Sequence, residues 1–197
     1  MEPTQTDRLI VEGLVLTTAA DGSPHLAPMG PQVDRQFQSF TLRPFCTSQT
    51  FANFERTRTA VFHVTDNVEL IARSAIGRMV QLPEYQTIDV SPGYALADCC
   101  RWFALRATTA DLGPPRATFH CEVIQSQHVR DWFGFNRAKH AVVEAAILAT
   151  RIGILPAADI RTEMARLESL VQKTAGEQER IGWELLCAHI QGKLEPE

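Results

Sequence analysis

Three hydroxyl side chains lie close together at the start of the octet TSQTFANF, residues 47–54. The octet follows a strand-like segment, FQSFTLRPF, and is typical of a helix start, because either Thr47 or Ser48 can cap the helix. Since one capping oxygen is enough, at least one other hydroxyl remains in the first turn. Helix N-termini carry unpaired N–H groups and about half a positive charge, so added hydroxyls make them good phosphate-binding sites.

Arg43, near the end of the preceding strand, is expected to direct its guanidinium toward the same point. Each hydrogen bond to a charged phosphate contributes roughly 1.5–3 kcal/mol, so three or four such contacts would anchor a small phosphorylated ligand. Ser and Thr are also ordinary cap and loop residues. The octet alone therefore leaves a simple helix start open as the alternative.

The elements that must position the octet are mostly strands, because Val, Ile, Thr and Phe are frequent in the first two thirds of the chain. Six strands are predicted, over residues 9–18, 24–34, 37–45, 59–65, 101–112 and 116–127. The second contains Pro24, Pro28 and Pro31, which cannot donate to a ladder, so it is expected at a sheet edge with backbone groups free for a ligand. The run at 59–65 is typical of a buried central strand. Residues 81–97 are expected to form a long connection.

Helical patterns dominate the last third of the chain. Short helices are predicted over 48–58 and 68–77, and three longer ones follow Asn136, Pro156 and Gly176. We therefore expect an α+β fold, in which a six-stranded antiparallel barrel over residues 1–130 precedes a helical subdomain over residues 131–197.

Composition limits the classes of function. The net charge of −4 and the pI of about 5.9 argue against binding to nucleic acid. No apolar run approaches the roughly 20 residues of a membrane span, and the first residues are polar, so a cytoplasmic protein is expected. The five cysteines form no C-x-x-C pairs, and the six histidines show no ligand spacing, which favours reduced thiols and no metal site.

Four segments, taken in order, resemble the FMN-binding split barrels, the superfamily of the flavin reductases and the pyridoxamine-phosphate-oxidase-like proteins. The segments are EGLVLTTAADGSPHLAPMG, RPFCTSQTFANF, AVFHVTDN and NRAKHAVVEAAILATR. The resemblance is strongest to an uncharacterised branch of this superfamily, a family of unknown function with a helical C-terminal part. It covers most of residues 9–66 and 135–151.

The resemblance implies that FMN lies across the barrel at a homodimer interface. The strand next to the isoalloxazine ring then corresponds to Ala27, Pro28, Met29 and Gly30. The phosphate-binding loop of the family corresponds to Arg43, Pro44, Phe45, Thr47, Ser48, Thr50 and Asn53. On this basis the surplus hydroxyls are expected to bind the ribityl phosphate.

Two positions depart from the pattern of the family. Gln49 stands where a lysine is common, which removes a positive charge from the proposed phosphate site. His63 stands where the strand usually carries Asn, and we favour a hydrogen-bonded core histidine over a flavin contact there. Arg137, Lys139 and His140 begin a helix, where they either meet a second anion or form a solvated basic face.

The expected function is that of an FMN-dependent oxidoreductase, which exchanges a hydride or electrons with NADH, NADPH or another small redox partner. Because the flavin carries such chemistry, no side chain is assigned as catalytic. The chain also lacks the G-x-S-x-G, H-E-x-x-H and P-loop motifs. The alternatives are a flavin-binding or sensing module without turnover, and a barrel that binds a deazaflavin or haem instead.

Overall fold

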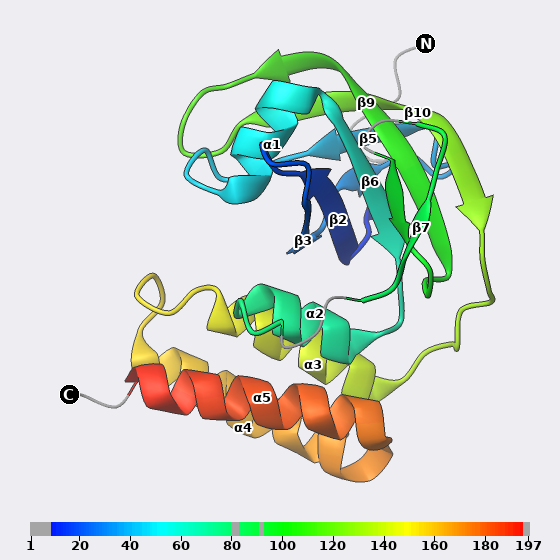
Figure 1. The fold of residues 1–197 in the computed structure, drawn as a ribbon. Coiled ribbons are helices and arrows are strands. Elements are labelled where there is room, and N and C mark those ends of the chain that lie inside the picture. Colours follow the sequence, from blue (N-terminus) through cyan, green and yellow to red (C-terminus); the bar gives the residue numbers. More distant parts are fainter. Residues whose placement is uncertain (1–8, 80–82, 91–92, 195–197) are drawn as a thin grey trace. The chain divides into compact units, whose positions relative to one another are not determined.

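The computed structural model describes residues 9–79, 83–90 and 93–194. These residues form two compact units. The first combines residues 1–65 with 83–131, and the second combines residues 66–82 with 132–197. The strands and one helix belong to the first unit, and four helices belong to the second (Figure 1).

The first unit is built on an eight-stranded sheet in which every neighbouring pair is antiparallel. In their order across the sheet, the strands are β1 (Leu9–Ile10), β4 (Gln32–Val33), β5 (Ser39–Leu42), β10 (Thr118–His128), β9 (Arg101–Asp111), β6 (Thr59–Val64), β2 (Gly13–Thr18) and β3 (Pro24–Met29). Figure 1 shows the sheet curling round on itself. The predicted α+β class and antiparallel barrel are confirmed, but the predicted number of six strands is wrong.

The two extra strands arise because two predicted strands each break in the middle. The first breaks between β1 and β2, and the second breaks between β3 and β4 at Gly30 and Pro31. At the break, the N–H of Val11 donates to the carbonyl of Pro31 over 3.2 Å. Because two-residue links join β1 and β4 at one end of the sheet to β2 and β3 at the other end, the sheet has to curl.

The proline-rich strand lies at an edge, as predicted. Among the strands that the structure describes, β3 is the last of the sheet and pairs only with β2, where Pro28 lies opposite Leu14 and Pro24 lies opposite Thr18. The prediction of a buried central strand is also confirmed, since β6 lies between β9 and β2 and its first five residues are buried.

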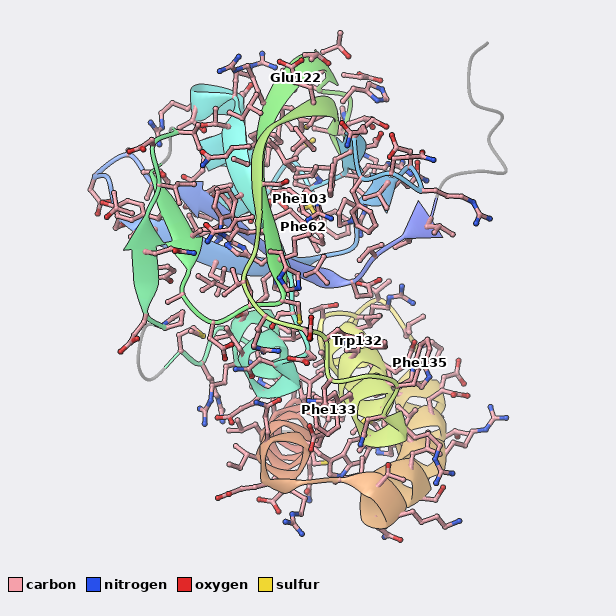
Figure 2. All side chains as sticks on the ribbon, turned by 90° about the vertical axis from the view of Figure 1, so that its right-hand side faces the viewer. Phe62, Phe103, Glu122, Trp132, Phe133 and Phe135 are labelled. Carbon is pink, nitrogen blue, oxygen red and sulfur yellow. The ribbon has the colours of Figure 1, made fainter. Side chains whose placement is uncertain are left out.

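Aromatic rings fill the inside of the curled sheet. Phe62 and Phe103 are opposite each other on β6 and β9, and Figure 2 shows them together within the sheet. Phe40 packs against both, with ring centroids 5.7 and 5.1 Å away. All three side chains are almost completely buried, so each contributes on the order of 2–3 kcal/mol of hydrophobic stabilisation.

Residues 81–97 were expected to form a long connection, and that expectation is wrong where the structure describes them. They contain a hairpin of β7 (Tyr85–Thr87) and β8 (Tyr94–Leu96). Strands of three residues are too short to show a two-residue period, which is why the pattern was missed. Residues 81, 82, 91 and 92 lie outside the description.

The second unit consists of α2 (Val68–Ala75), α3 (Arg137–Ala149), α4 (Ala157–Thr174) and α5 (Glu177–Leu194). The three predicted C-terminal helices are confirmed. Gly182 allows close packing, since a Cβ there would lie 3.1 Å from Val142 Cγ1 and 3.3 Å from Glu69 Cα. Among the described residues, none of the helices combines the length and the apolar character needed to cross a bilayer.

Candidate functional site

The helix predicted from the octet is α1 (Gln49–Thr57), and Ser48 is its cap. The Ser48 hydroxyl accepts a hydrogen bond from the N–H of Phe51 over 3.1 Å. The same hydroxyl donates to the carbonyl of Phe45 over 2.7 Å, and the Ser48 N–H donates to that carbonyl over 2.9 Å. The choice between Thr47 and Ser48 is therefore settled, and Thr47 is left exposed beside the first turn.

The first turn of α1 is positively polarised. The N–H groups of Gln49 and Thr50 lie in the first turn of α1, where helix geometry provides no acceptor within the helix for them. The first turn contains no acidic residue, so nothing there offsets the positive end of the helix dipole. Thr50 is almost completely buried, whereas Thr47 is exposed. Two N–H groups and the Thr47 hydroxyl thus form the donor set at this end.

Two arginines flank the loop that leads into α1. Arg43 is exposed at the end of β5, and its carbonyl accepts a hydrogen bond from Arg116 Nη1 over 2.9 Å. The Arg116 guanidinium lies over the half-exposed Phe45 ring, 3.6 Å from its centroid. Sequence reasoning missed Arg116. Antiparallel pairing of the predicted strands 37–45 and 116–127 would have placed it beside Arg43, but their register was not evident.

Asn53 and Gln49 hold α1 in place. The Asn53 side chain is only 2% exposed, and its Nδ2 donates to Thr17 Oγ1 on β2 over 3.0 Å. Gln49 Nε2 donates to Asn53 Oδ1 over 2.7 Å. Phe54 completes the attachment, since its buried ring lies 4.6 Å from that of Phe119. Gln49 therefore stabilises the orientation of Asn53 by a hydrogen bond within α1, and it does not supply the positive charge that a lysine would.

The edge strand lies in the same unit, and α1 packs against both β2 and β3. Ala27 and Met29 are half-buried and pack against the aromatic core, while no strand of the described residues pairs with the outer backbone edge of β3. The need for glycine at position 30 comes from the chain itself. A Cβ there would lie 2.6 Å from a carboxylate oxygen of Glu12, so the group that approaches Gly30 closely is the chain's own.

His63 is a core histidine, as we favoured. It is fully buried, its Nδ1 lies 3.2 Å from the carbonyl of Leu14, and its Nε2 accepts from the N–H of Leu96 over 3.0 Å. These partners fix the neutral tautomer with the proton on Nδ1. Burial lowers the pKa of His63 to about 4. Since both ring nitrogens are engaged, His63 has no lone pair to offer a haem iron.

Comparison with known families identifies the chain. The family model described as "Protein of unknown function (DUF447) N-terminal domain" matches residues 11–130, and the one described as "Protein of unknown function (DUF447)" matches residues 136–188. The chain belongs to the DUF447 family. No curated protein matches the chain.

Solved structures share the fold. The FMN-bound DUF447 protein MM1853 from Methanosarcina mazei is 20% identical, with a TM-score of 0.77 over 91% of this chain and 94% of that one. A flavin reductase domain protein from Arthrobacter sp. FB24 is 18% identical, with a TM-score of 0.52 over 64% and 81%. The flavin reductase HpaC, solved with NADP+, is 16% identical, with a TM-score of 0.50 over 63% and 81%. The predicted likeness to a family of unknown function with a helical C-terminal part is thereby confirmed, and the barrel fold is shared with flavin reductases.

Arg137, Lys139 and His140, at the start of α3, do not form a single basic surface. Lys139 is largely buried, and its Nζ lies 2.7 Å from Glu179 Oε1 and 2.7 Å from the carbonyl of Asp66. Burial would raise the pKa of Glu179, but the hydrogen bonds from Lys139 and from the N–H of Gly176 outweigh it and lower the pKa. Lys139 therefore serves the packing of the helices. Arg137 and His140 are exposed.

Proposed function

We propose that this protein binds FMN in its barrel unit and works as a flavin-dependent oxidoreductase, exchanging a hydride or electrons with a small redox partner. The observation that carries the proposal is the likeness to the FMN-bound protein MM1853, which belongs to the same family and matches over nearly the whole of both chains. The likeness to flavin reductases over nearly two thirds of the chain supports the same class of chemistry.

The residues at the start of α1 fit a phosphate. The donor set consists of the N–H groups of Gln49 and Thr50 and the hydroxyl of Thr47, with the exposed Arg43 nearby and no acid in the first turn. This combination favours a dianion and disfavours a cation. The Ser48 hydroxyl is not counted as a phosphate donor, because it donates its proton to the carbonyl of Phe45 and so holds the turn in place.

The edge strand fits the flat, largely apolar ring of a flavin. Ala27 and Met29 provide half-buried apolar side chains, and the prolines of β3 keep another strand from adding to this edge. When bound, the flavin supplies the capacity to accept and donate electron pairs or hydride. The chain's own residues bind and orient the flavin, and we assign no catalytic side chain.

NADH or NADPH is the proposed electron donor, because the flavin reductase HpaC, which shares the barrel fold, was solved with NADP+. We also infer a homodimer, since the chain leaves Leu9 and Ile10 exposed and all six residues of the edge strand β3 only half-buried. The five free cysteines favour a reducing compartment, so we place the protein in the cytoplasm.

The absorbance spectrum of the purified protein, recorded before and after incubation with excess FMN, tests the binding. We expect the absorbance bands of an oxidised flavin to appear, and mass spectrometry of the released molecule should identify FMN rather than a deazaflavin. A protein that stays colourless after reconstitution overturns the proposal.

Anaerobic addition of NADH or NADPH then tests the redox function. We expect the flavin absorbance to bleach, because a reductase must accept a hydride from its donor. Bound FMN that neither nicotinamide reduces would instead support a flavin-binding module without turnover.

A further inference from the structure

The edge strand β3 contains one titratable side chain, His25, to which the site described above gives no role. The first unit has four histidines, and the other three have partners in the chain: His63, His120 and His128. Within the part of the chain that the structure describes, no hydrogen bond or ion pair holds the ring of His25. The residue is half-buried, and both of its ring nitrogens therefore remain for a ligand.

His25 lies on the face of β3 that is proposed to meet the flavin ring. Side chains alternate along a strand, so His25, Ala27 and Met29 share one face at steps of roughly 6.6–6.8 Å. Ala27 and Met29 pack against the aromatic core and are the apolar side chains that fit the flavin ring. His25 adds the polar and ionisable side chain of this face.

The same residue is close to the start of α1. His25 lies directly opposite Thr17 on β2, which places their Cβ atoms roughly 4.5–5.5 Å apart. Thr17 Oγ1 accepts the hydrogen bond from Asn53 of α1, and Gln49, in the first turn, binds Asn53. His25 therefore lies between the proposed phosphate site at the start of α1 and the proposed ring site farther along β3.

The charge state of His25 in the chain itself is set by burial. Burial lowers the pKa of His25, so the ring is neutral at pH 7. β2 has no ionisable side chain, and Asp21, in the turn before β3, binds a neighbouring serine. The charged residues of α1, Glu55 and Arg56, are exposed, and Arg56 donates to the carbonyl of Thr18. A negative charge that a ligand brings close to the ring would raise the pKa of His25.

We propose that His25 faces the bound flavin and takes up a proton when the flavin is reduced. The inference rests on the proposed function and adds a proton-accepting residue to that site. A hydride from NADH or NADPH brings two electrons to the neutral flavin ring, which leaves the ring with one negative charge and the nicotinamide oxidised. The proton that His25 binds comes from solvent, so one hydride and one proton enter the site in each reduction.

Proton uptake by His25 makes the reduction of the flavin depend on pH. A group whose pKa rises on reduction binds a proton in that step, so a lower pH favours the reduced state. The dependence extends from the lowered pKa of His25 beside the oxidised flavin to its raised pKa beside the reduced one. The pair of protonated imidazole and anionic ring stabilises the reduced flavin within this range.

The midpoint potential of the bound FMN, measured against pH around neutrality, counts the protons taken up with two electrons. We expect the potential of the wild type to fall with pH up to about twice as steeply as that of His25→Gln, because the wild type takes up two protons and the variant takes up one. Glutamine still forms hydrogen bonds but does not titrate. His128→Gln removes an exposed histidine of the same unit and should follow the wild type, which makes it the matched control.

NMR spectroscopy of the wild type tests the contact without any substitution. Adding FMN to the apoprotein should shift the ring resonances of His25 and leave those of His128 in place, because His25 is the histidine on the face proposed to bind the flavin. Reducing the bound FMN with dithionite should then raise the pKa of His25.

The outcomes separate this inference from the proposed function. Equal pH slopes for the wild type and His25→Gln, or a pKa of His25 that reduction leaves unchanged, would overturn the inference while the FMN site stands. A protein that binds no FMN would overturn it together with the proposed function. If circular dichroism shows that His25→Gln is not folded, the NMR titration of the wild type alone decides.

Discussion

Neighbouring residues of similar chemistry have different tasks at the start of α1. Ser48 caps the helix through two hydrogen bonds of its hydroxyl, Asn53 is buried against β2, and Gln49 braces Asn53. Of the hydroxyl and basic side chains in this loop, Thr47 and Arg43 are exposed and remain to face a ligand. The octet TSQTFANF therefore contains both the support of the proposed phosphate site and the site itself, and single substitutions should separate the two.

Thr47→Ala should weaken FMN binding without loss of stability, because the side chain is exposed and is not the cap. Losing one hydrogen bond to a charged phosphate corresponds to a roughly 10- to 100-fold weaker affinity. Fluorescence titration of the apoprotein with FMN measures this change. Ser48→Ala should instead lower the free energy of unfolding by about 1 kcal/mol, the usual effect of removing a cap. The assignment is wrong if Thr47→Ala binds FMN as tightly as the wild type.

His63 should make the stability of the protein depend on pH. Its pKa is about 4 in the folded chain and ordinarily 6.5, so the unfolded chain binds the proton more readily. The stabilisation is therefore fully present above pH 6.5 and is lost as the pH falls through about 4, a difference of about 3 kcal/mol.

Urea unfolding of the wild type and of His63→Gln at several pH values checks this dependence. A glutamine amide can donate and accept hydrogen bonds but does not titrate here. We expect the variant to be less stable at pH 7 and to lose less stability between pH 6.5 and 4 than the wild type does. Identical pH profiles would show that His63 is not the titrating group.

At the scale of elements, the sequence predicted the helices and strands whose sequence signals lie within a few neighbouring residues. α1 has a cap and an apolar face, β6 is a continuous apolar run, and the prolines of β3 allow only an edge position. Each of these signals lies within a few residues. The breaks between β1 and β2 and between β3 and β4 were not predicted, because they depend on which strands lie at the two ends of the sheet.

In the candidate site, too, the sequence revealed the residues that are close along the chain but not those that only the fold brings together. Thr47, Ser48 and Arg43 were found because they are close in sequence, whereas Arg116 was missed because it joins them only through the pairing of β5 with β10. The resemblance to a family placed Asn53 in the phosphate loop. Its burial and its hydrogen bond to Thr17 depend on tertiary packing that no local pattern reveals.

Gly13 and Gly192 should respond in opposite ways to the same substitution. A Cβ at Gly13 would lie 2.3 Å from the carbonyl oxygen of His63 and 2.7 Å from the ring of Phe62, so Gly13→Ala must push β2 away from β6. We expect a loss of about 1–3 kcal/mol, as for other overpacked cores.

At Gly192, in α5, a Cβ would meet nothing within 4 Å. Gly192→Ala should therefore stabilise the protein by up to about 1 kcal/mol, because alanine is the better helix former. Thermal or urea unfolding of the two variants measures both changes in stability, the expected loss for Gly13→Ala and the expected gain for Gly192→Ala. Equal effects at the two positions would contradict the close approach of β2 to β6.

At the scale of the whole molecule, the helical unit is assembled from distant parts of the chain. α2 follows β6 directly, yet it belongs with α3, α4 and α5, which come more than 60 residues later. The amphipathic pattern of α2 predicts that one face is covered but not which helices cover it. Lys139 contributes to this assembly, since it binds the carbonyl of Asp66, just before α2, and the carboxylate of Glu179, at the start of α5.

Lys139→Met should therefore destabilise the helical unit more than the loss of one surface ion pair would. The two side chains are only 15% and 8% exposed, so removing the lysine leaves the Glu179 carboxylate buried without its cation. Loss of one partner from a buried pair costs about 3–5 kcal/mol, against at most about 1 kcal/mol for an exposed pair. Arg166→Met removes such an exposed pair with Glu163 in α4 and serves as the matched control.

The double variant Lys139→Met/Glu179→Leu shows whether the cost comes from the stranded charge. If it does, the double variant should recover much of the free energy of unfolding, because two apolar side chains can replace a buried pair at little cost. Lowering the pH should also relieve Lys139→Met alone, since protonation removes the charge of Glu179. A double variant as unstable as Lys139→Met at every pH would instead mean that Lys139 acts through its hydrogen bond to Asp66, which joins α3 to the segment before α2.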